Sequence, residues 1–424
     1  MKRIVAAILG YGIVGQGVGA LLTGEAHGLL TDEGLDVELR YCLDRGPVPD
    51  LPLSDRIVTD PDIIFNDPEI DIVCETMGGV TDSYTYTKRA LSAGVHVVTS
   101  NKALVAKHGQ ELLRLAAENG VRYLYEAAVG GGIPLLRNLR SSFPSTQITR
   151  VAGVLNGTSN YILTQMAASG TSFNAALSQA QDLGFAERDP SDDVEGTDSA
   201  RKIAIIGSLL TASAIPTDAV RIWGINHLNE HVFDVVNHLG LTLRHVALFE
   251  MRGDKRRYDL MVAPMLLPAD HSLAVARGVG NAVEVRTSQA GDYLFAGPGA
   301  GGLATASALV ADVLSCFSQE VGKSFIERWD QPVDSFLTDD LQRPCRALLL
   351  APSGIWKQVH TEAAEHVRQR FTPILPDYPD EELLIMQTPQ QGYTEKQLAE
   401  DLQTLAASNE TEQAEILVLR YLAD

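Results

Sequence analysis

The feature that most constrains the fold is a glycine-rich turn close to the N-terminus. Residues 3–9 form a short apolar run, Gly10-Tyr-Gly-Ile-Val-Gly15 follows at once, and a helical pattern comes next. In such a turn the first glycine permits a tight bend, the second lets a pyrophosphate approach the backbone, and the third allows close packing of helix and strand. We therefore predict a dinucleotide site at the helix N-terminus, contacted by Gly10, Tyr11, Gly12, Ile13, Val14 and Gly15.

The remainder of the first third alternates apolar runs with helical patterns. We expect strands at 37–43, 70–75, 95–100 and 122–125, and helices at 82–93 and 103–119. This alternation predicts an α/β fold with a doubly wound parallel sheet of the Rossmann type, in which ligands bind beyond the carboxyl ends of the strands. The residues that follow these strands and are expected at the cofactor are Asp44, Arg45, Thr76 and Lys102.

Asp44 and Arg45 bear on the choice of cofactor. A carboxylate after the second strand suits the ribose diol of NAD, whereas an adjacent arginine suits the 2′-phosphate of NADP. Because this chain has both residues, the pattern leaves the choice open, and Arg45 favours NADP over NAD.

Charge and composition narrow the class of partner. A net charge of −20 over 424 residues argues against binding to a phosphate backbone, and no apolar run reaches the roughly 18 residues that span a bilayer. Four scattered cysteines indicate neither a zinc site nor a disulfide framework. We expect a cytoplasmic protein of two or three domains that binds a small-molecule substrate, with no nucleic-acid or membrane partner.

Residues 184–202 contain six acidic side chains and lead into an apolar helix. Thr197 is the expected N-cap of that helix, and Asp198 would lie in its first turn, where the helix dipole favours a carboxylate. Lys202 follows Asp198 by four residues, so the two share one helix face. The residues alone allow either a capped surface helix with one ion pair or a pocket that holds a lysine acid/base beside carboxylates.

Glu126, which precedes Val-Gly-Gly-Gly-Ile, also allows two interpretations. The segment could be an ordinary turn between a strand and a helix. Alternatively, one carboxylate together with the exposed carbonyls of a glycine loop offers oxygen ligands to a hard cation.

Longer motifs of this chain resemble, in order, those of the homoserine dehydrogenase family. Besides the glycine turn and the 180–202 stretch, they are Thr99-Ser-Asn-Lys-Ala-Leu104, Tyr125-Glu-Ala-Ala-Val-Gly-Gly-Gly-Ile-Pro134, Gly153-Val-Leu-Asn-Gly-Thr-Ser-Asn-Tyr-Ile-Leu163, and residues 262–268, 281–283, 297–301 and 305–312. The resemblance spans about residues 1–320, with small departures at Ser159 and Leu303-Ala304.

The resemblance implies an NAD(P)H-dependent, reversible reduction of L-aspartate 4-semialdehyde to L-homoserine, a step of threonine, methionine and isoleucine biosynthesis. It implies that Lys202 is the proton donor and that Lys102 is a second active-site lysine near cofactor and substrate. Two lysines that converge disfavour each other's charge, which would lower a lysine pKa toward working pH. The alternatives are a catalytically silent NADPH-binding regulator and a related amino-acid aldehyde or imine dehydrogenase.

The resemblance also assigns residues around the substrate and around a cation. Those at the substrate are Gly184, Glu187, Asp198 and, in support, Asp193, while Gly299 lies at the cofactor. A monovalent cation such as Na⁺ would be held by the Glu126 side chain and by the carbonyls of Val129, Gly131 and Ile133, as structural support rather than chemistry.

Three domains are expected from this resemblance. Residues 1–134 form the NAD(P)-binding domain, completed by a returning helix at about 304–330, and residues 135–303 form an α+β domain for substrate binding and dimerisation. That domain implies a homodimer or homotetramer.

The pattern of residues 343–424 predicts strands and helices in the order βαββαβ, which resembles the ACT regulatory fold. In this chain Ala351-Pro-Ser-Gly-Ile replaces the usual Asp-x-Pro-Gly-Val. The C-terminal region therefore either binds threonine as a feedback ligand or serves only in dimerisation.

Overall fold

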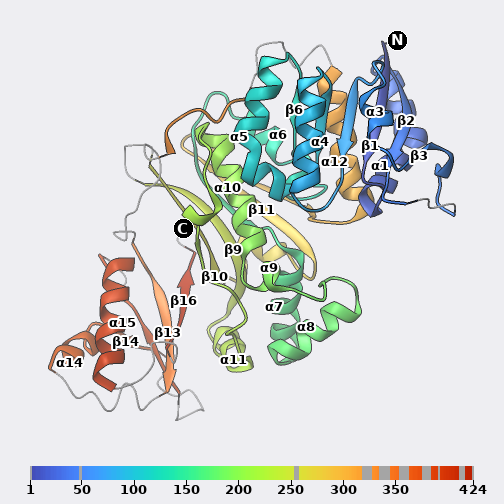
Figure 1. The fold of residues 1–424 in the computed structure, drawn as a ribbon. Helices are drawn as coiled ribbons and strands as arrows, with labels where there is room; N and C mark the ends of the chain where they lie inside the picture. Colours follow the sequence, from blue (N-terminus) through green and yellow to red (C-terminus); the bar gives the residue numbers. More distant parts are fainter. Residues whose placement is uncertain are drawn as a thin grey trace.

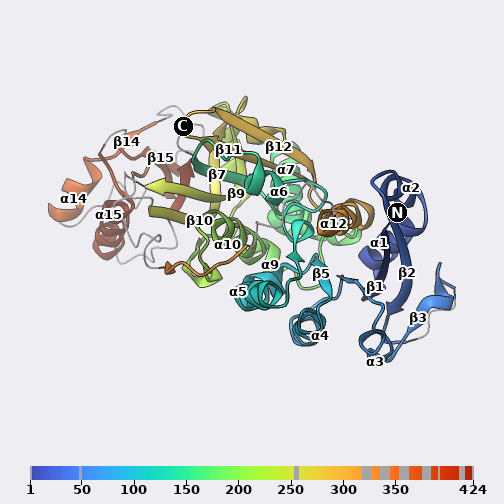
Figure 2. The same cartoon turned by 90° about the horizontal axis from the view of Figure 1, so that it is seen from above.

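A computed structural model describes residues 2–46, 50–252, 257–317, 327–333, 344–352, 362–374, 383–389, 392–409 and 416–422. These residues form two β-sheets with helices packed on both (Figures 1 and 2). Within the described ranges, no helix combines the length and apolarity needed to cross a bilayer.

The N-terminal sheet has six parallel strands in the order β3-β2-β1-β4-β5-β6. Its strands are β1 (Lys2–Leu9), β2 (Leu35–Leu43), β3 (Ile57–Val58), β4 (Ile72–Glu75), β5 (His96–Thr99) and β6 (Tyr123–Leu124). The order reverses between β1 and β4, which is where a doubly wound sheet binds its ligand. The predicted Rossmann-type parallel sheet is confirmed.

Helices cover both faces of this sheet, so the strands are apolar on both sides. The helices are α1 (Ile13–Thr23), α2 (Glu25–Asp32), α3 (Asp62–Phe65), α4 (Thr81–Ser92), α5 (Lys102–Glu118) and α12 (Gly302–Phe317). Val5 and Ala7 of β1 face the core shared with α4 and α5, whereas Ile4 and Ile8 face the core shared with α1 and α12.

Helix α12 returns from late in the sequence to pack against α1, as Figure 2 shows. Leu309 and Val313 join Val18 and Leu22 in one buried cluster. The predicted range of 304–330 was too long at its end. The helix is described as far as Phe317, residues 318–326 lie outside the described ranges, and residues 327–330 are not helical. Trp329 instead accepts a hydrogen bond on its carbonyl from Gln110 of α5 (2.7 Å).

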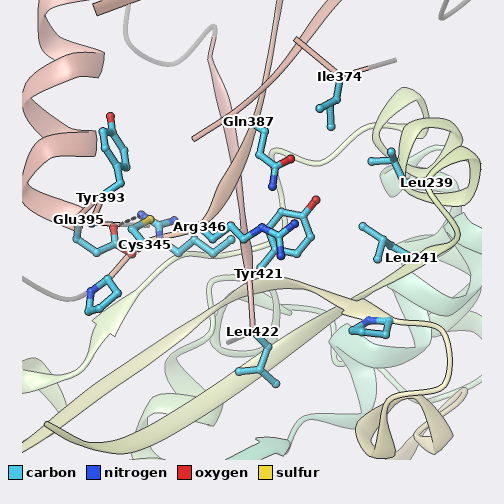
Figure 3. A pocket seen from close by; sticks show the side chains of 14 residues that line it. Leu239, Leu241, Cys345, Arg346, Ile374, Gln387, Tyr393, Glu395, Tyr421 and Leu422 are labelled. Carbon is cyan, nitrogen blue, oxygen red and sulfur yellow. Dashed lines mark hydrogen bonds and ion pairs between the residues drawn. The ribbon is translucent and has the colours of Figure 1, made fainter. Parts of the chain in front are cut away.

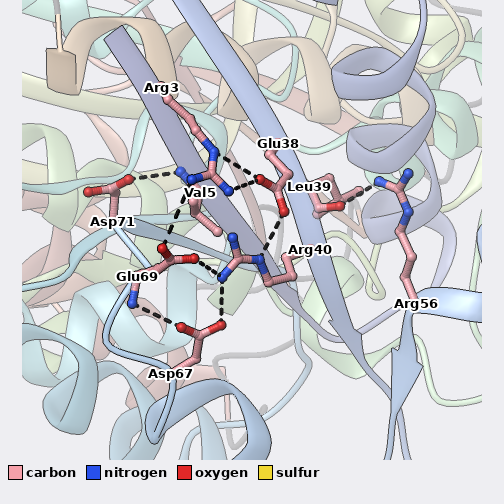
Figure 4. Close-up of polar contacts among 9 residues, drawn as sticks. All are labelled: Arg3, Val5, Glu38, Leu39, Arg40, Arg56, Asp67, Glu69 and Asp71. Carbon is pink, nitrogen blue, oxygen red and sulfur yellow. Dashed lines mark hydrogen bonds and ion pairs between the residues drawn. The ribbon is translucent and has the colours of Figure 1, made fainter.

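A network of charged side chains fastens the loop before β4 to strand β2 (Figure 4). Arg40 contacts Asp67 and Glu69 at 2.8 Å each and Glu38 at 2.9 Å. Asp71, just before β4, accepts a hydrogen bond from the backbone N–H of Val5 (2.8 Å). These contacts fasten the amino end of β4 to the middle of β1 and β2.

The second sheet is mixed, in the order β12-β11-β7-β9-β10-β16-β13-β15-β14, with β8 also on β10. Its strands are β7 (Ile148–Val154), β8 (Arg221–Ile222), β9 (Leu241–Arg252), β10 (Arg257–Pro268), β11 (Gly280–Thr287), β12 (Asp292–Pro298), β13 (Ala347–Pro352), β14 (Thr372–Pro373), β15 (Leu383–Gln387) and β16 (Leu417–Tyr421). Alternate residues face opposite sides. Val151 and Phe249 therefore pack with Ile203 of α10.

The remaining helices are α6 (Leu136–Ser141), α7 (Gly157–Ser169), α8 (Phe173–Asp182), α9 (Ser191–Val194), α10 (Thr197–Thr211), α11 (Glu230–His238), α14 (Glu362–Arg368) and α15 (Glu395–Asn409). The C-terminal elements follow the predicted βαββαβ order, from β13 through α14, β14, β15 and α15 to β16. Strand β16 pairs with β10, with Met265 opposite Arg420, so the two regions share one sheet. The predicted departure at 353–355 lies outside the described residues, and the ACT-like assignment stays a prediction.

Candidate active site

A cavity of about 300 Å³ opens at the carboxyl ends of β1, β2 and β4. Six of the predicted cofactor residues line it: Gly10, Tyr11, Gly12, Asp44, Arg45 and Thr76. Ile13, Val14 and Gly15 continue from it into the first turn of α1. Lys102 and Gly299 do not line this cavity. The six lining residues therefore meet at the strand ends, where a Rossmann-type sheet holds its dinucleotide.

The glycine turn has the geometry that its sequence predicts. Gly10 adopts a φ of +96°, a conformation open to glycine but strained for other residues. A side chain at Gly15 would begin 2.1 Å from the carbonyl oxygen of Gly10, so only glycine lets α1 approach the strand this closely. Thr76 secures the turn by donating its hydroxyl hydrogen to that carbonyl (2.5 Å).

Tyr11 lines the cavity but does not offer it a side chain. Its ring is only 2% exposed, and its hydroxyl donates to the carbonyl of Pro52 (2.8 Å). The Tyr11 side chain is therefore held inside the protein, and the residue can offer the cavity its backbone. Asp44 also has a local bond, because its carboxylate accepts from the backbone N–H of Arg45 (2.6 Å). The exposed guanidinium of Arg45 stands at the rim of the same cavity.

Two lysines from different parts of the chain converge on one buried carboxylate. Asp198 is 3% exposed, and its Oδ2 lies 2.7 Å from Nζ of Lys202. Its Oδ1 lies 2.9 Å from Nζ of Lys102, whose side chain is 39% exposed. Nζ of Lys202 also donates to the carbonyl of Leu155 (2.7 Å). The interpretation of residues 198–202 as a mere surface ion pair is wrong, because the pair is buried beside a second lysine.

The residues at which α5 and α10 begin determine where the side chains of Lys102 and Asp198 lie. Asn101 caps α5 by accepting from the N–H of Leu104 (3.0 Å), which leaves Lys102 as the first helical residue, directly beyond β5. Helix α10 carries Asp198 in its first turn, as predicted, and packs against α5. The predicted N-cap was wrong: Gly196 caps α10 in a left-handed conformation, and Thr197 is already helical.

The charges of this group stabilise one another. Burial would raise the pKa of Asp198, but the two ammonium groups and their hydrogen bonds hold it well below its usual range. The Asp198 carboxylate in turn raises the pKa of Lys102 against the opposing effect of burial. The predicted lowering of a lysine pKa is therefore wrong for Lys102. Asp198 lies between the two ammonium groups and outweighs their repulsion.

Asn156 is a member of this group to which the sequence pattern assigned no role. Its amide nitrogen donates to Asp198 (2.9 Å) and to Asp193 (2.6 Å). Its oxygen accepts from the N–H of Ser159 (2.8 Å) and so caps α7. Asp193 thus joins the group through Asn156, and burial raises its pKa. In the sequence, Asn156 was marked only by an Asn-Gly turn between a predicted strand and a predicted helix.

Gly184 and Glu187 lie in the exposed loop after α8. Thr158 of α7 anchors that loop by donating its hydroxyl hydrogen to the carbonyl of Phe185 (2.7 Å). Among the described residues, no hydrogen bond or ion pair joins the Glu187 carboxylate to Lys102, Asp198 or Lys202. The structure therefore does not bring Glu187 into the lysine group, and its role at the substrate stays a prediction.

Glu126 begins a short 3₁₀ turn, Glu126–Ala128, which Tyr125 separates from β6. Its two carboxylate oxygens accept from the backbone N–H groups of Leu136 (2.9 Å) and Arg137 (2.7 Å). Burial, and after it the nearby Asp312 carboxylate, raises the pKa of Glu126 to about 7. A carboxylate has about four lone-pair sites, so each oxygen can still bind a cation. The glycine loop that follows supplies further carbonyl oxygens, which suit a hard cation.

A larger cavity, of about 590 Å³, is lined by residues of the C-terminal region and by Leu239, Leu241 and Pro268 (Figure 3). Leu239 and Leu241 line one side, and Arg346 projects into the cavity beside the Tyr421 ring, with the guanidinium 4.4 Å from the ring centre. Arg420 is paired with Glu395 through two hydrogen bonds (2.9 and 3.1 Å). Neither Lys102, Asp198 nor Lys202 lines this cavity, and it shares no lining residue with the cofactor cavity.

The cavity lies at the switch point of a parallel sheet, where a dinucleotide binds, and the buried Asp198 carboxylate holds a lysine of α5 and a lysine of α10 together. These features define the class of nicotinamide-dependent oxidoreductases. Family models agree: one described as "Homoserine dehydrogenase, NAD binding domain" matches residues 10–126, and one described as "Homoserine dehydrogenase" matches residues 134–314. The chain belongs to the homoserine dehydrogenase family, whose members are NAD(P)-dependent oxidoreductases.

Individual relatives support this membership. Homoserine dehydrogenase of Bacillus subtilis is 36% identical over 334 residues, which cover 77% of this chain and 76% of that protein. A homoserine dehydrogenase structure from Thiobacillus denitrificans superposes with a TM-score of 0.87 at 28% identity, over 99% of this chain and 98% of that one. A hyperthermophilic archaeal homoserine dehydrogenase in complex with NADPH superposes with a TM-score of 0.62 at 25% identity, over 74% of this chain and 98% of that one.

Proposed function

We propose that this chain catalyses the reversible reduction of L-aspartate 4-semialdehyde to L-homoserine, with NADPH as the preferred cofactor. The observation that carries the proposal is the buried Asp198, which holds Lys202 and Lys102 at 2.7 and 2.9 Å. This arrangement offers a proton and a second positive charge beside a nicotinamide site. The test is oxidation of NADPH by the purified protein when L-aspartate 4-semialdehyde is added.

The lysine group matches what aldehyde reduction requires. When bound, the nicotinamide supplies a hydride to the aldehyde carbon. The former carbonyl oxygen then carries negative charge and needs a proton donor within hydrogen-bond reach. Lys202 donates that proton, and its bonds to Asp198 and to the Leu155 carbonyl fix its Nζ in position. Lys102 places a positive charge near the same oxygen, where it stabilises the developing anion.

The substrate's α-ammonium group calls for carboxylates. We assign the binding of this ammonium group to Glu187 on the exposed loop. Gly184, which has no side chain, leaves room for the substrate there. Both oxygens of Asp198 already contact lysines, so Asp198 acts mainly by orienting them. Asp193 supports Asp198 through their shared partner Asn156.

Replacing Arg45 by alanine is expected to raise the KM for NADPH about tenfold and to leave the KM for NADH nearly unchanged. Arg45 is exposed at the rim of the cofactor cavity and can pair with a 2′-phosphate, and a hydrogen bond to a charged group contributes about 1.5–3 kcal/mol. Initial rates with both cofactors measure the effect. Arg114→Ala, which removes a 64% exposed arginine of α5, is the control. Equal changes for the two cofactors would exclude this role.

We propose that Glu126 and the carbonyls of Val129, Gly131 and Ile133 hold a monovalent cation such as Na⁺. Because a ligand that binds only the folded state stabilises it, adding NaCl in place of choline chloride should raise the melting temperature by about 2–4 °C. Glu126→Gln should abolish this difference. A melting temperature that depends on ionic strength alone, identical for the two salts, would rule out the site.

For assembly, we propose a homodimer built on the second sheet. The edge of β10 that faces away from β9 is already occupied by β8 and β16, whereas β12 is an edge strand among the described strands, with Tyr293 and Leu294 exposed.

We also propose that the C-terminal region is an ACT-like module. Calorimetry with L-threonine distinguishes its two roles: heat with inhibition indicates a feedback site, and no heat indicates a module for dimerisation alone.

A further inference from the structure

Glu75 is the last residue of β4 and is 0% exposed, although it lies at the sheet edge that carries the cofactor cavity. A buried carboxylate is costly unless it is paired or hydrogen-bonded. Among the described residues, no lysine, arginine or histidine forms an ion pair with it. Its hydrogen bonds must therefore compensate for its burial, and their partners indicate its purpose.

Two donors from different segments converge on this carboxylate. The backbone N–H of Met77 donates to Oε1 (2.8 Å), and the hydroxyl of Thr99 donates to Oε2 (2.5 Å). Met77 belongs to the turn that lines the cofactor cavity, and Thr99 is the last residue of β5. Glu75 therefore joins the cofactor turn to the neighbouring strand end.

The network continues from Thr99 to Lys102. The oxygen of the Thr99 hydroxyl accepts from the backbone N–H of Asn101 (2.9 Å). The amide of Asn101 caps α5 and donates to the carbonyl of Gly79 (2.7 Å), at the far end of the cofactor turn. Lys102 is the next residue. One connected set of hydrogen bonds thus fixes both the 76–79 turn and the start of the helix that presents Lys102 to Asp198.

We propose that Glu75 is a positioning residue, which acts through Thr99 and Asn101 to set both the cofactor turn and Lys102. This inference rests on the proposed function for the role of Lys102. A carboxylate is needed because both contacts are donors: a glutamine could accept from one of them but would present its NH₂ group to the other. Burial raises the pKa of Glu75 to about 7, and the hydrogen bonds from Thr99 and Met77 oppose that rise.

The test uses isosteric changes in the full-length protein. Thr99→Val removes the bridging hydroxyl without changing the volume, and Glu75→Gln removes one acceptor. Each should lower kcat/KM with NADPH about 10- to 100-fold, because small displacements of catalytic groups have effects of this size. The loss should appear in kcat, through Lys102, and in the dissociation constant for NADPH, through the turn. Thr99→Ser, which restores the hydroxyl, should recover most of the activity.

Asp71→Asn is the matched control. Asp71 precedes the same strand at its other end and bonds one backbone N–H, so its loss should affect melting temperature but not kinetics. The inference is overturned if Thr99→Val and Glu75→Gln lower only the melting temperature, or if Asp71→Asn changes kinetics equally. A wild-type protein that binds NADPH but does not reduce the semialdehyde would contradict the proposed function instead, and the NADPH dissociation constants of the variants would still test Glu75.

Discussion

Replacing Lys202 by alanine is expected to lower the turnover of L-aspartate 4-semialdehyde by about 10²–10⁴-fold, which is the usual contribution of a general acid. Nζ of Lys202 is buried and is held by Asp198 and by the Leu155 carbonyl, both at 2.7 Å. Affinity for NADPH should change little, because Lys202 does not line the cofactor cavity. Initial rates of NADPH oxidation, together with NADPH titration, measure both quantities.

The fold should tolerate this change. Asp198 keeps its contact with Lys102 at 2.9 Å, so no buried carboxylate is left without a positive partner. Lys107→Ala, which removes an exposed lysine of α5, is the control for loss of a lysine as such. Turnover by Lys202→Ala within threefold of the wild type would remove Lys202 from the proton-transfer step.

Replacing Asp198 by asparagine should have the second large effect. Without the carboxylate two lysines face each other, and breaking a buried ion pair costs about 3 kcal/mol or more. We expect a comparable loss in the free energy of unfolding and a fall in turnover of about 100-fold as both lysines shift. Because Asp198 raises the pKa of Lys102, its removal should make Lys102 lose its proton at lower pH. The alkaline limb of the kcat profile should therefore move toward lower pH.

Asp192→Asn is the matched control, since it lies in the same acidic stretch but has a 61% exposed side chain paired with Arg201. Its unfolding free energy and pH profile should resemble those of the wild type. If Asp198→Asn behaves like Asp192→Asn in both measurements, the carboxylate does not organise the two lysines.

The sequence predicted those features that depend on neighbouring residues. Gly10 and Gly15 are required by the turn itself, and the apolar runs of a parallel sheet are recognisable because both faces are buried. The spacing of Asp198 and Lys202 fixes them on one helix face. The resemblance to a family added Gly299 and placed Lys102 and Lys202 in one active site, and at Glu126 it favoured the cation site over an ordinary turn.

Features that depend on tertiary contacts were beyond the sequence. The approach of Lys102 to the other oxygen of Asp198 requires α5 and α10 to pack together, and it reverses the expected direction of the Lys102 pKa shift. Asn156 was visible only as the residue of a turn, yet it bonds two carboxylates. Gly196 displaced Thr197 as the cap because the chain enters α10 in a left-handed conformation. The pairing of β16 with β10 joins strands from distant segments.

The most direct test of the central claim is a single assay of the purified protein with NADPH and L-aspartate 4-semialdehyde. We predict stoichiometric oxidation of NADPH with formation of L-homoserine, and a rate that falls by about 10²–10⁴-fold in Lys202→Ala. Tight binding of NADPH without turnover would contradict the claim and indicate a silent regulator. Turnover of a different amino-acid aldehyde or imine, with none of the semialdehyde, would contradict it in favour of a related dehydrogenase.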